Sequence, residues 1–198
     1  MIVFSNTTNM KTISISIRIF LVFTILTGVI YPFLVTGIAQ AFFPYQANGS
    51  LITENKRTIG SELIGQQFDN AAYFSSRPSA NGYQPLPSGG SNYGLTNARL
   101  KAQFIDRDKH FIQFNHLPEN TNVPSEMVFA SASGLDPHIS PRAAELQIDR
   151  IAKIRRFRPD KKQKLKQLVE KLSEKPQLGF LGESRVNVLL LNIELDQL

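Results

Sequence analysis

The chain has 198 residues, no cysteine and a formal net charge of +6. Without cysteine it has no disulfide, thiolate metal site or cysteine nucleophile. The basic excess lies in residues 142–176, where 12 Lys and Arg face 5 Asp and Glu. That balance is typical of solvated helix surfaces, and we expect no nucleic-acid partner.

The first predicted element is a helix over residues 19–43. No charged residue occurs between Arg18 and Glu54, and these 25 residues are almost wholly apolar. As a helix they would extend about 37 Å, enough to cross a hydrocarbon core of about 30 Å. Pro32 is compatible with such a span, because helices in membranes tolerate proline. We therefore predict one transmembrane helix in contact with membrane lipid.

Lys11 and Arg18 precede this span, and no acidic residue does. Positive flanks stay in the cytoplasm, which predicts a cytoplasmic segment 1–18 and an extracytoplasmic remainder on a cell inner (plasma) membrane. The rival interpretation is a signal peptide cleaved after Ala39-Gln40-Ala41. The apolar run exceeds the roughly 7 to 15 residues of the hydrophobic region of a signal peptide, which favours a retained anchor. Met10 is a second possible start of the chain.

Residues 44–56 are polar and predict a short stalk, after which residues 57–198 have the size of a single domain. From residue 58 to 87, short apolar groups alternate with Gly, Asn, Ser and Pro, which indicates short strands and turns. The Pro-, Gly- and Ser-rich run 85–94 predicts a surface loop. Residues 95–114 predict a helix capped by Thr96 or Asn97.

Residues 126–131 predict a strand. Ser140 and Pro141 are an N-cap and first-turn pair, so a helix should begin at Pro141 and end at Pro159. Its expected apolar stripe consists of Ala144, Ile148, Ile151 and Ala152.

Asp160 should cap a second helix, whose apolar positions are Leu165, Leu168, Val169 and Leu172. The apolar run 186–195 predicts a strand buried on both faces. Together these elements predict a mixed α/β (α+β) domain, with a small sheet covered by helices.

Reactive side chains are densest between Ser131 and Ser140, where hydroxyls, a carboxylate and the His138 imidazole lie within ten residues. A membrane-anchored or secreted hydrolase using Ser133 or Ser131 with His138 is one hypothesis. No Gly-x-Ser-x-Gly motif is present, and adjacency in sequence does not form a catalytic triad. The alternative is structural: Gly134, Asp136 and Pro137 shape a turn into the following helix.

Other patterns give weaker signals. The three histidines match no metal-ligand spacing, so no metal site is expected. The run from Ser88 to Asn92 is glycine-rich but lacks the Lys-Ser/Thr ending of a phosphate-binding loop. Arg77, followed by Pro78, presents a guanidinium either to an acidic partner or to a group within the fold.

Read in order, several segments resemble the KdpC family, the C subunit of the Kdp potassium-transporting P-type ATPase, from Lys11 onward. The early matching segments are Leu26-Thr27-Gly28 with Tyr31-Pro32, Gln46-Ala47-Asn48-Gly49-Ser50-Leu51, Gly60-Ser61-x-Leu63-Ile64-Gly65-Gln66, and Tyr73-Phe74-x-x-Arg77-Pro78-Ser79. The later ones are Ser88-Gly89-Gly90-Ser91-Asn92, Gly94-x-Thr96-Asn97, Ser133-Gly134-Leu135-Asp136-Pro137-His138-Ile139-Ser140-Pro141 and Leu181-Gly182-Glu183-x-Arg185-Val186-Asn187-Val188. Leu95 departs from the family, which more often has proline there.

The resemblance implies a non-catalytic accessory subunit of an ATP-driven K⁺ uptake complex. It implies a catalytic P-type subunit and a channel-like K⁺-binding subunit as partners, so that ATP and K⁺ belong to the complex and this chain alone holds no cofactor. It also implies help in assembly and a raised ATP affinity of the catalytic subunit. An extracytoplasmic domain would act on that affinity only through its partners. Gln147 matches a glutamine position implicated in nucleotide contact in the family, but we expect a surface or interface residue there first.

Overall fold

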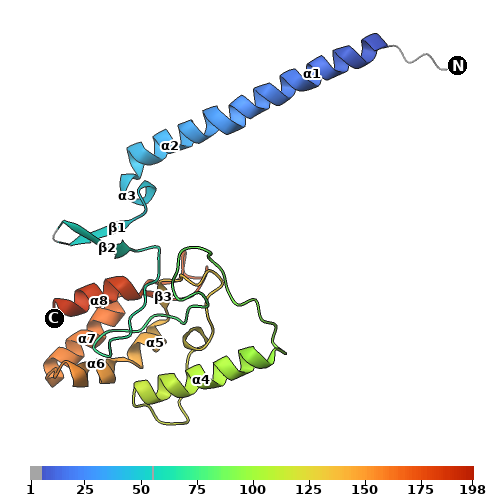
Figure 1. The fold of residues 1–198 in the computed structure, drawn as a ribbon. Helices are drawn as coiled ribbons and strands as arrows, with labels where there is room; N and C mark the ends of the chain where they lie inside the picture. The colour runs from blue at the N-terminus through green and yellow to red at the C-terminus, as the bar shows by residue number, and fades with distance from the viewer. Residues whose placement is uncertain (1–5, 55) are drawn as a thin grey trace. The chain divides into compact units, whose positions relative to one another are not determined.

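The computed structural model describes residues 6–54 and 56–198 (Figure 1). Its contacts divide the chain into two units, Met1–Ser50 and Leu51–Leu198. The first unit contains the long apolar helix that the sequence predicts. The second is a mixed domain of helices and two small two-stranded sheets, as the sequence also predicts.

The apolar helix consists of α1 (Asn6–Ile25), a π-helical turn η1 (Leu26–Ile30) and α2 (Tyr31–Phe42). Within it, Met10–Phe42 is long and apolar enough to cross a membrane, and its most apolar 18-residue window has a mean hydropathy of 2.3. None of its most apolar window is buried within the protein. Every apolar side chain of this stretch is therefore available to a membrane or to another helix.

Pro32 lies in the first turn of α2, directly after the π-helical turn. The backbone NH of Tyr31 donates to the carbonyl of Leu26, five residues earlier. Proline has no NH to continue the usual pattern, and a single wide turn is a common adjustment in such helices. The proline is thus accommodated without ending the helix.

The predicted stalk, residues 44–56, is divided between the two units. It begins with a helical turn, α3 (Pro44–Ala47), and ends in β1 (Leu51–Glu54). Strand β1 pairs antiparallel with β2 (Arg57–Ser61).

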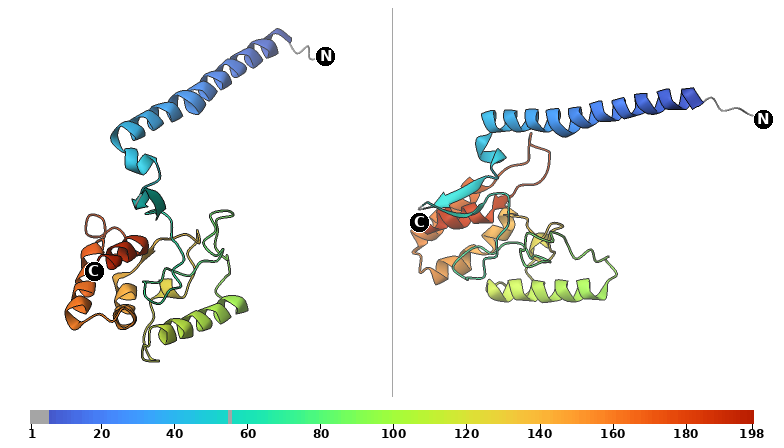
Figure 2. Two further views of the ribbon diagram at one scale, coloured as in Figure 1. Left: turned by 60° about the vertical axis from the view of Figure 1, so that its left-hand side comes forward. Right: turned by 45° about the horizontal axis from the view of Figure 1, so that its top comes forward.

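In the remainder of the second unit the regular elements are mostly helices, separated by long irregular segments (Figures 1 and 2), and they pack around one core. Its elements are α4 (Ala98–Phe114), the 3₁₀ helix η2 (Ser125–Met127), β3 (His138–Ile139), α5 (Pro141–Glu145), α6 (Ile148–Ile154), α7 (Pro159–Leu172), β4 (Val186–Asn187) and α8 (Val188–Asp196). Helices α5 to α8 gather on one side of the domain and α4 lies apart from them, with the irregular segment 62–97 between.

Helix α7 packs against α5, α6 and α8 and supplies the centre of the core. The predicted apolar stripes face inward in both regions: Ala144, Ile148, Ile151, Ala152, Leu165, Leu168 and Val169 are all buried. Leu172 packs partly buried against the same cluster. The helical periodicity therefore identified the core faces correctly.

The predicted strand over residues 186–195 is wrong. Only Val186–Asn187 is a strand, and Val188–Asp196 forms α8. The Asn187 side chain accepts from the backbone NH of Leu190 and so caps this helix. A short apolar run fits a buried strand and a buried helix equally well, and here the cap and three consecutive leucines favour the helix.

The predicted strand over residues 126–131 is also wrong. Residues 125–127 form a 3₁₀ turn, in which the backbone NH groups of Met127 and Val128 donate to Pro124 and Ser125. These local hydrogen bonds satisfy the backbone without a partner strand. The buried Met127 and Val128 explain why the segment is apolar.

Two predicted helix boundaries need correction. The helix that begins at Pro141 does not run to Pro159; it is interrupted at Leu146 and Gln147 and ends at Ile154. Pro159 instead opens α7, with Arg158 in the cap position, so Asp160 lies in the first turn and is not the cap. In contrast, Asn97 does cap α4, accepting from the backbone NH of Arg99 at 2.8 Å.

Candidate functional site

The short sheet β3–β4 brings together two predicted motifs from distant parts of the sequence. His138 pairs with Asn187, and Ile139 pairs with Val186. The backbone NH of Val188 extends this pairing by donating to the carbonyl of Pro137 at 2.9 Å. Segment 133–141 and segment 181–188 therefore form one structural unit.

Asp136 is the centre of a charged cluster beside this sheet. Its carboxylate accepts from the Arg77 guanidinium at 2.6 Å and lies 3.5 Å from Nδ1 of His138. The backbone NH of His138 donates to the same carboxylate at 3.0 Å. Burial opposes ionisation of Asp136, but the hydrogen bonds from His138 and Arg77 outweigh it and lower the carboxyl pKa to about 2. Asp136 is therefore a fixed negative charge that fastens Arg77 to the motif.

Ser140 and Pro141 begin α5 as predicted. The Ser140 hydroxyl accepts from the backbone NH of Ala143 at 3.1 Å, and Pro141 occupies the first turn. The backbone NH of Ser140 donates to the Glu126 carboxylate at 3.2 Å. These contacts fix the direction in which the chain leaves the motif.

The glycine-rich segment from Ser88 to Asn92 packs against this motif. The Ser88 hydroxyl and the Gly89 backbone NH both donate to the carbonyl of Ser133, at 3.0 and 3.2 Å. Gly134 has a φ of +72°, and a Cβ there would lie 2.5 Å from the Asn81 side-chain oxygen. The glycine-rich segment therefore packs against the turn at Ser133 and Gly134 within the same domain.

The hydroxyls of Ser131 and Ser133 bond to the backbone and not to the imidazole of His138. Ser133 accepts from the backbone NH of Leu135 at 3.1 Å, and Ser131 accepts from that of Asp136 at 3.4 Å. A hydrolytic serine needs its hydroxyl bonded to the general base. The structure gives the hydrolase hypothesis no support, and both serines shape the turn.

A groove of about 410 Å³ runs along the motif. The side chains of Arg77, Asp136, His138 and Arg185 line it, so its charge is mixed. Arg185 is itself paired with the Glu174 carboxylate at 2.9 Å. Within residues 6–54 and 56–198, no group of three or more His, Asp or Glu side chains is placed to hold a metal ion.

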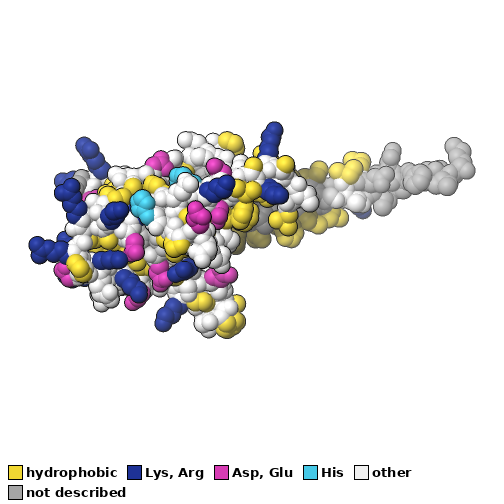
Figure 3. Space-filling view, turned by 90° about the horizontal axis from the view of Figure 1, so that it is seen from below, with side chains coloured by type: hydrophobic (Ala, Val, Ile, Leu, Met, Phe, Trp, Pro, Cys, Tyr) yellow, Lys and Arg dark blue, Asp and Glu magenta, His cyan; other side chains and the backbone are white. Residues whose placement is uncertain are grey.

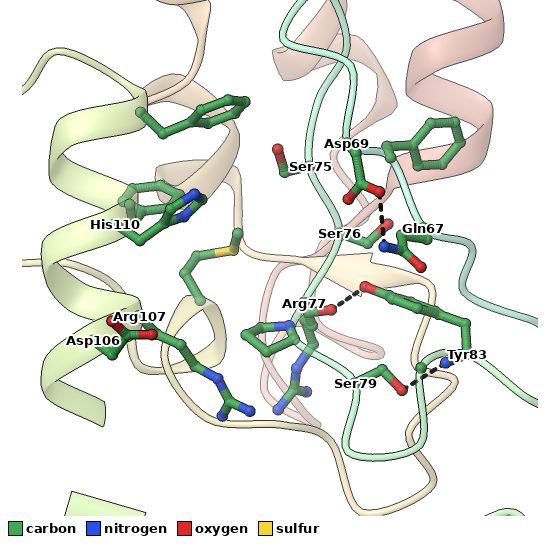
Figure 4. Close-up of a pocket in the computed structure, with 16 residues that line it drawn as sticks. Gln67, Asp69, Ser75, Ser76, Arg77, Ser79, Tyr83, Asp106, Arg107 and His110 are labelled. Carbon is green, nitrogen blue, oxygen red and sulfur yellow. Dashed lines mark hydrogen bonds between the residues drawn. The ribbon is translucent and has the colours of Figure 1, made fainter. Parts of the chain in front are cut away.

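A larger cleft of about 600 Å³ lies between α4 and segment 67–83 (Figure 4). Arg77 and Pro78 line it on one side and Arg107 on the other. The hydroxyl of Tyr83 donates to the carbonyl of Arg77, and burial raises the pKa of Tyr83 to about 12. The Tyr83 phenol therefore stays neutral and holds the backbone at Arg77.

Gln147 lies inside the domain, so the expectation of a surface residue there is wrong. It has no exposed area, and its side-chain oxygen accepts from the backbone NH of Ser75 and from Arg150, both at 2.8 Å. Its amide nitrogen donates to the carbonyls of Ala143 and Ser75. Nucleotide contact at Gln147 stays a prediction, and it would require these hydrogen bonds to break.

Sequence reasoning missed further buried polar residues, among them Arg150 and Asn192. The Arg150 guanidinium donates to the carbonyl of Ala71 and, at 2.9 Å, to the side chain of Asn115. Burial lowers the pKa of Arg150 to about 10. The Asn192 amide bonds to both backbone groups of Phe74, at 2.8 and 3.0 Å. For Asn192 the available signal was a polar residue within the apolar run 188–193. Arg150 lies in a helix that also contains Asp149 and Lys153, so no local pattern marks it as buried.

Taken together, these features define a class of protein: one apolar N-terminal helix followed by a compact domain whose motif side chains are bonded within the fold. Figure 3 shows both basic and acidic side chains on one face of the chain, with basic side chains gathered toward one edge of the domain.

The family model described as "K+-transporting ATPase, c chain" matches residues 13–197. A potassium-transporting ATPase KdpC subunit of Geotalea uraniireducens is 52% identical over 193 residues, which cover 96% of this chain and 99% of the relative. Those of Leptospira interrogans and Caldanaerobacter subterraneus are 46% and 45% identical, covering 93% and 91% of this chain and 93% and 92% of the relatives. The chain belongs to the KdpC family, as the motifs in its sequence indicate.

Proposed function

We propose that this chain is the membrane-anchored, non-catalytic accessory subunit of a K⁺-transporting ATPase complex. The observation that carries the proposal is the family match over residues 13–197. Its partners are a catalytic P-type subunit and a channel-like K⁺-binding subunit, which handle ATP and K⁺. The hydrogen bonds of Ser131 and Ser133 to the backbone support a role without chemistry of its own.

The proposed topology follows from charge. Residues 1–18 are cytoplasmic, residues 19–43 cross the cell inner membrane, residues 44–56 connect, and residues 57–198 form the extracytoplasmic domain. Lys11 and Arg18 support this direction, because basic flanks are retained in the cytoplasm. Met10–Phe42 supports the span by length and composition.

The accessory role includes assembly of the complex and a higher ATP affinity of the catalytic subunit. The domain lies across the membrane from cytoplasmic ATP, so the effect passes through the partner subunits as a coupling free energy. Gln147 supports this indirect route, because the hydrogen bonds of its side-chain amide are made with other residues of the same domain.

The test is to purify and reconstitute the complex with the full chain, without it, and with a chain ending after Ser50. We expect omission of the chain to lower complex recovery and ATP-dependent K⁺ uptake and to raise the KM for ATP. The shortened chain contains the anchor without the domain. If it restores assembly but leaves the KM for ATP high, the effect on ATP affinity belongs to the domain. Unchanged recovery, uptake and KM without the chain would refute the proposal.

A further inference from the structure

The hairpin between Glu174 and Arg185 carries an apolar tip that the fold leaves uncovered. At the tip, Leu178 is 83% exposed, Phe180 is 75% exposed and Leu181 is 50% exposed. Single exposed apolar side chains are common on protein surfaces, but three within four residues of one turn make a local apolar surface. The core does not account for them, because none of the three belongs to its buried cluster.

The tip has a defined shape. The backbone groups of Glu174 and Arg185 exchange two hydrogen bonds at the base, and those of Gln177 and Leu181 exchange two more at the tip, both at 2.9 Å. These hydrogen bonds hold the tip as a closed turn, and its three apolar side chains remain exposed.

Leu178 has a φ of +53°, a conformation that costs a branched side chain free energy and that Gly or Asn adopts more readily. Such local strain recurs at sites where a residue serves a partner. The hairpin itself therefore gains neither apolar burial nor a relaxed backbone from Leu178.

The bilayer that holds the apolar helix is always within reach of this domain. The candidate span ends at Phe42 and the second unit begins at Leu51. The intervening chain, residues 43–50, extends at most about 30 Å. In Figures 1 and 2 the hairpin projects from the same end of the domain as β1, where the chain enters.

We propose that the tip, residues 177–181, is a second membrane contact, which inserts Leu178, Phe180 and Leu181 into the boundary between headgroups and acyl chains of this same bilayer. Amphipathic helices bury their apolar faces at that depth, with a strength that scales with the apolar area inserted, and we extend the same physics to the exposed side chains of this turn. Within the hairpin, Lys175 and Arg185 balance Glu174 and Glu183. The contact therefore depends on apolar insertion and needs no anionic lipid, and it restrains the domain at the membrane surface.

The chain contains no tryptophan, so Phe180→Trp introduces a single fluorescent reporter at the tip. The full chain is reconstituted into bilayer nanodiscs of phosphatidylcholine with or without brominated acyl chains, which quench tryptophan on contact. The matched control is Leu95→Trp, in the loop before α4, where the native side chain is 93% exposed. We expect brominated lipid to quench the tip reporter at least about three-fold more than the control, and the emission of the tip reporter to be blue-shifted. Salt at about 0.5 M screens exposed charges, so it should leave the quenching unchanged.

Leu178→Ser with Leu181→Ser, added to the tip reporter, should lower its quenching to the level of the control while leaving the unfolding midpoint unchanged. Equal quenching at both positions would overturn the proposal. The same measurement in the assembled complex separates lipid from protein as the occupant. A blue-shifted tip reporter that brominated lipid fails to quench would mean that a partner subunit covers the tip, which also overturns the proposal.

Discussion

Arg77 and Asp136, which are 59 positions apart in the sequence, form an ion pair of 2.6 Å beside the β3–β4 sheet. Segment 67–83 contains no helix or strand, and this pair fastens it to the central motif. Buried polar contacts from Gln147, Arg150 and Asn192 hold the neighbouring residues 71–75 in the same way. An irregular segment is thus positioned by four side chains that are far from it in the sequence.

The first prediction concerns pH. The folded-state pKa of Asp136 is about 2, below its ordinary value of 3.8. Its contribution to stability is therefore complete above about pH 4 and is lost as the pH falls through 2. The contribution is at most about 2 kcal/mol and is reduced by solvent, because the side chain is 29% exposed. In urea unfolding of the full chain, the difference between wild type and Asp136→Asn should shrink from pH 6 to pH 2.5.

Asp149→Asn is the matched control for this measurement. Asp149 also forms an ion pair, at 2.9 Å with Lys162, but its side chain is 74% exposed. Exposed pairs contribute about 0 to 1 kcal/mol. If Asp149→Asn lowered the free energy of unfolding as much as Asp136→Asn, the Asp136 cluster would contribute no more than an exposed ion pair, and the prediction would be wrong.

The second prediction concerns the backbone of the motif. Gly134→Ala should lower the free energy of unfolding by more than about 1 kcal/mol, because φ is positive and the new methyl group meets Asn81 at 2.5 Å. Gly179→Ala shares the positive φ but has open space around it, so it should cost less. Gly89→Ala has open space without a positive φ and should be close to neutral. Denaturant midpoints of the three variants give the order, and equal losses would contradict the steric argument.

The third prediction concerns the buried polar network. Gln147→Ala leaves the Ser75 backbone NH and one Arg150 NH group without their acceptor, so we expect a loss of about 1 to 3 kcal/mol. Gln167→Ala, at an exposed position on α7, should be nearly silent. Chemical denaturation of the full chain measures both, and a silent Gln147→Ala would show that the network does not hold segment 71–75.

The fourth prediction compares two helix caps. Asn187 and Asn97 cap α8 and α4 with the same side-chain chemistry. Asn187 also donates to the carbonyl of Glu62 at 2.8 Å and is buried. Asn97→Ala should cost about 1 kcal/mol, and Asn187→Ala about 1 kcal/mol more. Losses of equal size in thermal unfolding would mean that the bond to Glu62 contributes nothing.

The fifth prediction concerns topology. Because the chain has no cysteine, a single cysteine reports its own side of the membrane. Ser91→Cys should react with a membrane-impermeant maleimide in intact cells, and Ser14→Cys only after permeabilisation. Labelling at Ser14 in intact cells would refute the proposed orientation. A mature product beginning after Ala41 would instead support the cleaved signal peptide.

Much of this protein could be predicted from local properties of the sequence. A long uncharged apolar run predicts the span, because its composition alone decides whether a helix is stable in lipid. The stripes through Ala144 to Ala152 and Leu165 to Val169 identify the core faces, because a helix brings every third or fourth residue to one side. Ser140 and Asn97 mark helix starts because a cap is a contact within one turn.

Tertiary structure decided the rest. Residues 186–195 are apolar whether they form a strand or a helix, and the choice depended on what surrounds them. Gln147 and Arg150 look like surface residues in the sequence, because backbone groups of segment 71–75, far away along the chain, supply part of their hydrogen bonds. Local patterns report the periodicity and chemistry of a segment, whereas burial and pairing depend on which distant segments fold against it.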